Sequence, residues 1–234
     1  MKHVTLTIVP FLVVSLLNET SPAQEPDRPR ERPSFNYGGA PEFDKPPLAR
    51  NDAEKRALAV LEKMTQGKWY LNVTTREGRV LRQLTEAVGA KRVVEIGTSS
   101  GYSTIWLALG VRAAEGKVLT HEIDPEKAKM ARANFEKAGV DDLITIIEGD
   151  AHETIKQHKE PIDVLFLDAE KKGYVDYLDK LLPLVRPGGL ILGHDMHRPM
   201  PDPRYVEAIT TNPDLDTSFI MMESFGISMT VKKR

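Results

Sequence analysis

The sequence predicts an α/β fold in which helices cover both faces of a mostly parallel, seven-stranded sheet that ends in an antiparallel hairpin. Two features lead to this prediction. After residue 50, short apolar runs typical of strands alternate with segments whose apolar residues recur at helical spacing. The last two apolar runs, 218–222 and 227–231, are joined by only four residues. Strands that alternate with helices form a doubly wound parallel sheet, whereas a short turn joins antiparallel neighbours.

Capping residues and glycines mark the expected helix ends. Asn51 and Thr74 each precede a glutamate by three residues, which is the spacing of a capping box. Asp124 is followed by a proline, the residue favoured at the first position of a helix. In chain order we expect helices after Asn51 and Thr74, a strand at 93–96, a helix at 103–109, a strand at 117–121, a helix from Asp124 to Gly139, a strand at 143–147, a short helix after Asp150, a strand at 162–167, a helix at 174–185 and a strand at 190–192. This order is typical of a Rossmann-like fold, and residues 196–205, with three prolines, are expected to form a loop.

The N-terminal part of the chain has the pattern of an export signal. Lys2 and His3 precede an uncharged run at 4–17, and Ser21 and Ala23 then offer the small residues that a signal peptidase reads. Because a membrane span takes about 20 apolar residues, we expect cleavage and export, with no stable membrane insertion afterwards. Residues 1–23 are therefore expected to be a signal peptide, 24–47 a proline-rich linker and 48–234 the folded domain.

Charge balance and the absence of cysteine exclude several kinds of protein. The chain has 32 Lys and Arg against 34 Asp and Glu, a formal net charge of −2. This balance excludes nucleic-acid binding by bulk positive charge, so we expect no nucleic-acid partner. With no cysteine in the chain, disulfides, thiolate metal sites and cysteine nucleophiles are excluded as well.

Carboxylates stand at the ends of the predicted parallel strands. In such sheets ligands bind at the carboxyl ends of the strands, next to the point where the strand order reverses. The residues just after each apolar run include an acid every time, namely Glu95, Glu122, Asp150, Asp168 and Asp195. Acids gathered at one sheet edge favour a site for a cation or a polyol ligand.

Two of these acids suggest the nature of the ligand. The turn at 97–101 has neither the dinucleotide nor the P-loop glycine pattern. Glu95 before this turn would repel a pyrophosphate but would suit an ammonium group, and Glu122 lies where an acid can hold both ribose hydroxyls. An amino acid joined to a nucleoside has both groups, which favours S-adenosylmethionine. The alternative is that each acid only caps a helix.

Several longer motifs then resemble a known family. The segments VVEIGTSSGYSTIWL (93–107), THEID (120–124) and GDA (149–151) resemble class I S-adenosylmethionine-dependent methyltransferases. LDAEK (167–171) and PGGLILGHD (187–195) are similar to the small cation-dependent O-methyltransferases, which include catechol and caffeoyl-coenzyme A O-methyltransferases. The resemblance implies methyl transfer from S-adenosylmethionine to a hydroxyl of a small, catechol-like phenolic acceptor, whose two adjacent oxygens a metal would chelate.

The resemblance also implies roles for individual residues. The cofactor site would be lined by Val73, Glu95, Gly97, Ser103, Glu122, Asp150, Ala151 and Asp168. Asp168 and Asp195 would bind a divalent cation (Mg²⁺ or Mn²⁺), and Lys171 together with Asp168 would be catalytic, Lys171 as the base near the acceptor hydroxyl.

One position departs from the family pattern. Met196 occupies the place of an asparagine that the family uses as a third metal ligand. A thioether is a poor ligand for Mg²⁺, which prefers oxygen. His194 or His197 could supply nitrogen instead and would favour Mn²⁺, Fe²⁺ or Zn²⁺, but we expect both histidines to be exposed on a loop.

Two other interpretations compete. Residues 97–101 also match the G-x-S-x-G nucleophile elbow of serine hydrolases, with Ser99 as nucleophile and Asp168 and a later histidine as partners. Against this, the elbow would follow the first strand, and no oxyanion-hole H-G-G-G segment precedes it. A non-catalytic relative that only binds S-adenosylmethionine is the other alternative, favoured by Met196 and by the export signal. Whether the chain forms a homodimer is left open.

Overall fold

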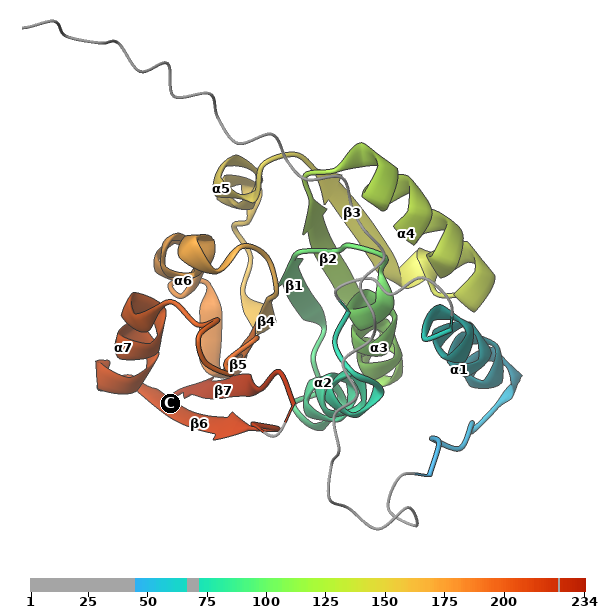
Figure 1. The fold of residues 1–234 in the computed structure, drawn as a ribbon, viewed down its shortest axis with the longest axis horizontal. Helices are drawn as coiled ribbons and strands as arrows, with labels where there is room; N and C mark the ends of the chain where they lie inside the picture. The colour runs from blue at the N-terminus through green and yellow to red at the C-terminus, as the bar shows by residue number, and fades with distance from the viewer. Residues whose placement is uncertain (1–44, 67–71, 223) are drawn as a thin grey trace, which may run out of the picture. The chain divides into compact units, whose positions relative to one another are not determined.

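The computed structural model describes residues 45–66, 72–222 and 224–234 (Figure 1). The expected signal peptide at 1–23 and nearly all of the expected linker at 24–47 lie outside the described residues. Among the residues that are described, no helix has the length and apolar character needed to cross a membrane.

Seven strands form one sheet, in the order β3-β2-β1-β4-β5-β7-β6. The first five strands along the chain are parallel to one another, and β7 is antiparallel to both β5 and β6. The strands are β1 (Arg92–Ile96), β2 (Lys117–Glu122), β3 (Ile144–Glu148), β4 (Ile162–Leu167), β5 (Val185–His194), β6 (Leu215–Ile220) and β7 (Ile227–Lys232). The predicted doubly wound sheet with its antiparallel hairpin is therefore confirmed.

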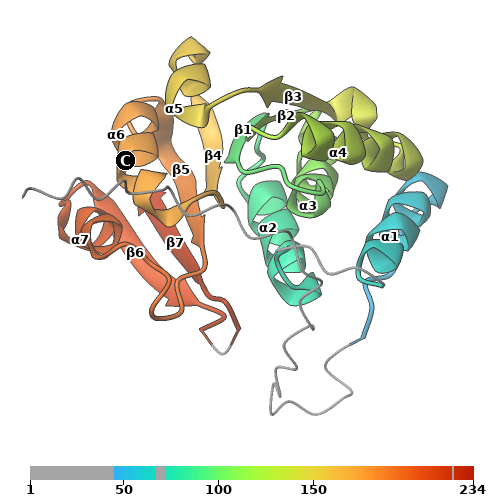
Figure 2. The same cartoon turned by 45° about the horizontal axis from the view of Figure 1, so that its top comes forward.

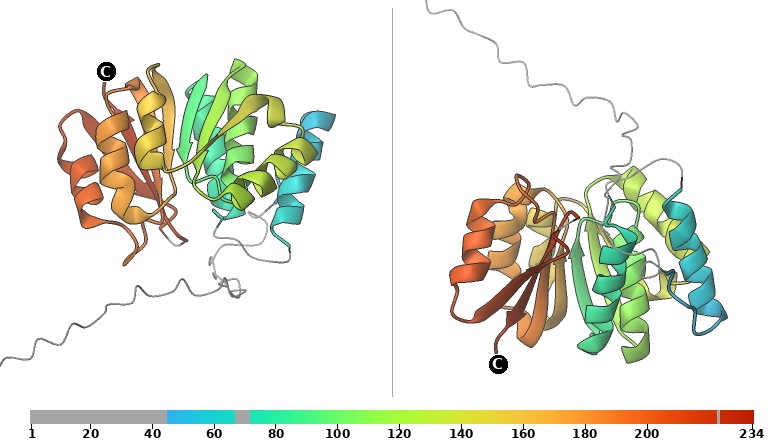
Figure 3. Two further views of the ribbon diagram at one scale, coloured as in Figure 1. Left: turned by 90° about the horizontal axis from the view of Figure 1, so that it is seen from above. Right: turned by 60° about the horizontal axis from the view of Figure 1, so that its bottom comes forward.

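Helices pack on both faces of this sheet (Figures 2 and 3). On one face lie α1 (Asp52–Met64), α2 (Thr75–Ala87), α3 (Tyr102–Val111) and α4 (Pro125–Ala138). On the other lie α5 (Ala151–Thr154), α6 (Tyr174–Leu181) and α7 (Pro203–Thr211). In the central strands β1, β4 and β5, alternate residues join the two cores, as Val93 and Val94 of β1 do, which is the pattern of strands buried on both faces of a sheet.

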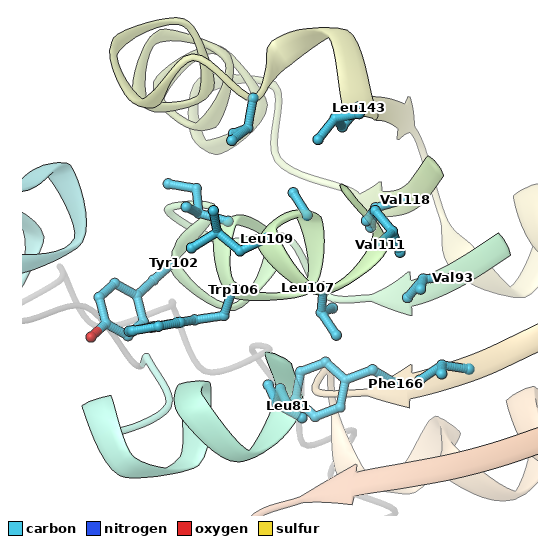
Figure 4. Close-up of a cluster of buried hydrophobic side chains, with 14 of the residues drawn as sticks. Leu81, Val93, Tyr102, Trp106, Leu107, Leu109, Val111, Val118, Leu143 and Phe166 are labelled. Atoms are coloured by element: carbon cyan, nitrogen blue, oxygen red, sulfur yellow. The ribbon is translucent and has the colours of Figure 1, made fainter. Parts of the chain in front are cut away.

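The core on the first face is built around α3 (Figure 4). All ten residues of this helix are buried, because it contacts β1 and β2 on one side and α1, α2 and α4 on the others. A helix that is apolar all round has no face left for solvent. Trp106 and Leu107 pack here near Leu81 of α2 and Phe166 of β4. This packing holds in place the turn that leads from β1 into α3.

The capping signals are confirmed for α2 and half confirmed for α1. Thr74 Oγ1 accepts from Glu77 N (3.2 Å), and Glu77 Oε2 accepts from Thr74 N (2.7 Å), so both halves of a capping box are present. At α1, Asn51 Oδ1 accepts from Glu54 N at 2.9 Å, which is the first half of a capping box. The Glu54 carboxylate, however, accepts from Arg50 N and not from the backbone of Asn51, so the second half is absent.

Several predicted boundaries are wrong, among them that of the strand expected at 218–222, which is Leu215–Ile220. The helix expected at 174–185 ends at Leu181, and β5 begins at Val185 instead of residue 190. Between the pairs Ile162–Val185 and Val164–Leu190 the register shifts, so the segment with Pro187 forms a bulge, where a residue without an N–H is tolerated. The loop expected at 196–205 is shorter, because Asp202 caps α7 with Pro203 at its first position. Asp202 followed by Pro203 repeats the pattern that starts α4, where Asp124 caps the helix and a proline follows.

Candidate active site

The carboxyl ends of β1 and β4 meet at the point where the strand order reverses. The turn after β1 lies directly against the end of β4. Gly97 has φ +106°, and a Cβ at this position would overlap the backbone carbonyl of Asp168. Only glycine combines this backbone conformation with so close an approach. Gly97 therefore brings the two strand ends together, as a ligand-binding turn requires.

The second side of the site is the end of β2. Glu122 Oε2 accepts from Ser99 N (2.7 Å) and Oε1 accepts from Asp124 N (2.9 Å), which fixes its carboxylate at the sheet edge. The next residue, Ile123, leaves its side chain 70% exposed at this edge. Gly149 N donates to the Glu122 carbonyl at 2.9 Å and so brings the end of β3 alongside.

Asp150 and Ala151 follow at this edge. Asp150 is exposed and caps α5, where its Oδ1 accepts from His152 N at 2.9 Å, and Ala151 is the first residue of that helix. Val73, just before α2, is only 3% exposed and belongs to the core of the first face. The roles that were expected for these three residues stay predictions.

Glu95 lies inside the sheet beneath the turn and is fully buried. Its two oxygens accept from the hydroxyls of Ser103 (2.6 Å), Thr104 (2.5 Å) and Thr120 (2.6 Å). Burial and, to a smaller extent, the charge of Asp168 raise the pKa of Glu95 to about 7 despite these hydrogen bonds. A nearby positive charge would keep this carboxylate ionised.

Lys171 joins the two aspartates that were expected to bind metal. Its Nζ is 2.9 Å from Asp195 Oδ2 and 3.4 Å from Asp168 Oδ1, and it donates to Tyr174 Oη at 2.7 Å. Tyr174 Oη in turn donates to the backbone carbonyl of Leu167 at 2.7 Å. The side chains of Asp168 after β4, Lys171 before α6 and Asp195 after β5 thus converge on one point. Their roles as metal ligands and base stay predictions.

His194 is the main correction to the predicted site. It is the last residue of β5 and is 3% exposed, so the expectation of loop exposure is wrong for it, whereas His197 is exposed as expected. His194 Nδ1 is 3.0 Å from Asp168 Oδ1, and Nε2 is 3.3 Å from Glu77 Oε2. Burial alone would lower the pKa of His194, but the carboxylates of Asp168 and Glu77 raise it to about 10.

Glu77 of α2 completes the group from the opposite side. It is fully buried, and its Oε1 accepts from Ser224 Oγ at 2.9 Å while Oε2 also accepts from Thr74 N. Burial would raise the pKa of Glu77, but the hydrogen bond and charge of His194 lower it to about 2. From the sequence this residue is expected only as part of a helix cap.

The structure also argues against the serine-hydrolase interpretation. Both ring nitrogens of His194 contact carboxylates, and His197 is exposed. Ser99 N is bound to Glu122, and no hydrogen bond joins Ser99 to a histidine within the described residues. A nucleophilic serine needs a histidine within hydrogen-bond reach.

Three residues of the site, Glu77, Tyr174 and Ile123, are not among those predicted from the sequence. Ile123 could have been found, because it directly follows the acid expected to hold the ribose. Glu77 and Tyr174 carry no such signal, since helix capping and core packing explain each of them equally well.

Comparison with known proteins identifies related chains. The family model described as O-methyltransferase matches residues 49–196. A catechol O-methyltransferase from Mycobacterium tuberculosis is 40% identical over 121 residues, covering 51% of this chain and 54% of that protein. A caffeoyl-CoA O-methyltransferase from Zea mays is 35% identical over 150 residues, covering 61% and 56%. The matches thus span little more than half the length of these two relatives.

Solved structures match over more of the chain. The crystal structure of the O-methyltransferase from Bacillus cereus in complex with SAH has a TM-score of 0.65 and 30% identity, covering 80% of this chain and 93% of that one. An O-methyltransferase from Klebsiella pneumoniae has the same TM-score at 28% identity, covering 80% and 92%. The likeness therefore extends beyond the segment that the family model matches.

Proposed function

The chain belongs to the O-methyltransferase family, and we propose that it transfers the methyl group of S-adenosylmethionine to a hydroxyl of a small, catechol-like phenolic acceptor, assisted by a divalent cation. The observation that carries this proposal is the convergence of Asp168, Lys171 and Asp195 beside the glycine turn at the reversal point of the sheet. Cofactor and acceptor would meet there.

The cofactor side is supported by Glu122, whose oxygens keep lone pairs for the ribose hydroxyls after accepting two backbone N–H groups. The exposed Ile123 offers an apolar surface to the adenine beside it. The buried negative charge available at Glu95 favours a cationic ligand over a phosphate. The related Bacillus cereus enzyme was solved with SAH bound.

The reaction is a displacement at carbon. The bond between the sulfonium sulfur and its methyl group breaks, its electron pair stays on sulfur, and a new bond forms between the methyl carbon and the acceptor oxygen. The hydroxyl proton passes to Lys171 Nζ acting as a free amine, which its hydrogen bond to Tyr174 Oη holds in position. Alignment of the two reactants supplies up to about 7–11 kcal/mol of the barrier.

The residues at this point fit a divalent cation. One ligand atom each from Asp168, His194 and Asp195 lies within 4.8 Å of the others. Oxygen and imidazole nitrogen are ordinary ligands of such ions. When bound, a cation would polarise the acceptor hydroxyl and make its proton easier to remove.

We also propose export of the protein on the basis of residues 1–23.

Calorimetric titration of the full-length protein with S-adenosylmethionine tests the proposal first. We expect micromolar binding that Glu122→Ala weakens at least tenfold, while the control Glu126→Ala, on the exposed surface of α4, leaves it unchanged. Methylation of catechol, followed by mass spectrometry with and without chelator, tests the transfer step. Cofactor binding without any methylated product would support a non-catalytic relative, and a folded protein that binds no cofactor would refute the proposal.

A further inference from the structure

The end of β5 directs two consecutive side chains to one point. Side chains of neighbouring strand residues ordinarily point to opposite faces of a sheet. Asp195, however, has φ +59°, a left-handed conformation that is uncommon for non-glycine residues and that aspartate adopts more readily than most. His194 Nδ1 and Asp195 Oδ1 are 3.5 Å apart, and both lie near Asp168.

These separations fit ligands of one metal ion. Two donor atoms at about 2.1 Å from a cation and at right angles to each other are about 3 Å apart. The distance from His194 Nδ1 to Asp168 Oδ1 is 3.0 Å. Met196 contributes nothing here, because its side chain is 3% exposed and packs into the core of the second face.

The orientation of the His194 ring is set from the other side of the site. Nε2 faces Glu77, which α2 and Ser224 hold in place with hydrogen bonds of 2.7 and 2.9 Å. Histidines that bind metals through one ring nitrogen characteristically donate the other N–H to a carboxylate or carbonyl. The contact points Nδ1 toward the two aspartates.

We propose that His194 is a nitrogen ligand of the divalent cation, together with Asp168 and Asp195, and that Glu77 is the residue that orients it. A cation takes the place of the proton through which Nδ1 contacts Asp168. It also displaces Lys171 Nζ from the aspartates, and the lysine keeps its hydrogen bond to Tyr174 Oη. This inference deepens the proposed function, on which its catalytic meaning rests. A set of one nitrogen and two carboxylates favours Mn²⁺, Fe²⁺ or Zn²⁺ over Mg²⁺.

Electron paramagnetic resonance of Mn²⁺ added to the full-length, chelator-treated protein tests the inference without any methyl transfer. We expect Mn²⁺ to bind in a one-to-one complex whose pulsed spectrum shows coupling to a directly bound imidazole nitrogen. His194→Gln should remove this coupling and weaken binding at least tenfold. Glu77→Gln should keep the coupling and weaken binding about tenfold. The matched control His197→Gln, an exposed neighbour, should change neither.

Bound Mn²⁺ without nitrogen coupling in the wild-type protein would overturn the inference, since the ligands would then be oxygen only. No Mn²⁺ binding at millimolar concentration would overturn it too, because Lys171 and His194 would then be the only cations at the aspartates. Since the wild-type spectrum decides the question, a variant that fails to fold does not obscure it. A chain that shows the coupling but never methylates an acceptor would refute the proposed function and leave this inference standing.

Discussion

A buried histidine pair should make the protein lose stability in mild acid. His121, near the end of β2, and His158 are 1% and 3% exposed, and their Nε2 atoms are 2.8 Å apart. One ring must donate to the other, so the contact is lost when both nitrogens carry protons. Burial lowers the pKa of His121 to about 3, with a further contribution from His158, and burial together with the charge of Arg92 lowers the pKa of His158 to about 4.

The size and sign of the effect follow from linkage. Both pKa values lie below the value of about 6.5 in the unfolded chain, so the unfolded state binds more protons as the pH falls. The stability that the neutral pair contributes is fully present above pH 6.5 and is lost as the pH falls toward 4. Each pH unit below 6.5 lowers the free energy of unfolding by up to about 1.4 kcal/mol per histidine, so at pH 5 the pair lowers it by about 2–4 kcal/mol.

Urea unfolding followed by circular dichroism at pH 7 and pH 5 measures this loss. Other groups titrate as well, so the test compares the wild-type protein with the double variant His121→Gln, His158→Gln. We expect the wild-type protein to lose about 2–4 kcal/mol more between the two pH values than the double variant does. The exposed-site control His197→Gln should keep the wild-type pH dependence. An equal loss in the wild-type protein and the double variant would refute the reasoning.

Three further predictions concern the site. Lys171→Ala should lower the methyl-transfer rate at least about 100-fold, measured by product formation, and leave the Kd of S-adenosylmethionine within about twofold; equal losses in both would contradict its role as base. Gly97→Ala should lower the free energy of unfolding by about 1–3 kcal/mol, because Cβ meets the Asp168 carbonyl at a positive φ, and an unchanged urea midpoint would show that the turn relaxes freely. Ile123→Ser should weaken cofactor binding by about 1 kcal/mol in calorimetry without changing the melting temperature, since the side chain is 70% exposed; a lowered melting temperature with unchanged affinity would assign it to packing instead.

The fold could be predicted from the sequence because its local signals agree with one another. Apolar runs marked the strands, and Thr74 with Glu77 and Asp124 with its proline marked helix starts that the structure confirms. Prediction was wrong where one residue type is found in more than one kind of local structure. Proline marks a loop, but it also starts α7 and fits a bulge in β5, and only the contacts of the folded chain decide among these.

The site was predictable only in so far as topology determines it. Parallel strands bring their carboxyl ends to one edge, so Asp168 and Asp195 could be expected together, with Lys171 one turn after Asp168. The burial of His194 could not be expected, because it depends on Glu77, which is 117 positions earlier in the chain. No local pattern shows such a pairing, and the histidine was therefore assigned to an exposed loop.

The C-terminal hairpin explains why this pairing is stable. Ser224, in the segment between β6 and β7, donates to Glu77, and the Phe225 ring lies 5.7 Å from that of His194. The backbone carbonyls of Phe225 and Gly226 accept from the two residues that follow Asp195. The antiparallel pair therefore extends the sheet and also contributes direct contacts to Glu77 and His194. Because three carboxylates, a lysine and a histidine are partly or fully buried here, each depends on the others for compensation of its charge. Removal of one partner should thus destabilise the centre more than its own hydrogen bonds suggest, and this interdependence favours a single arrangement of the group.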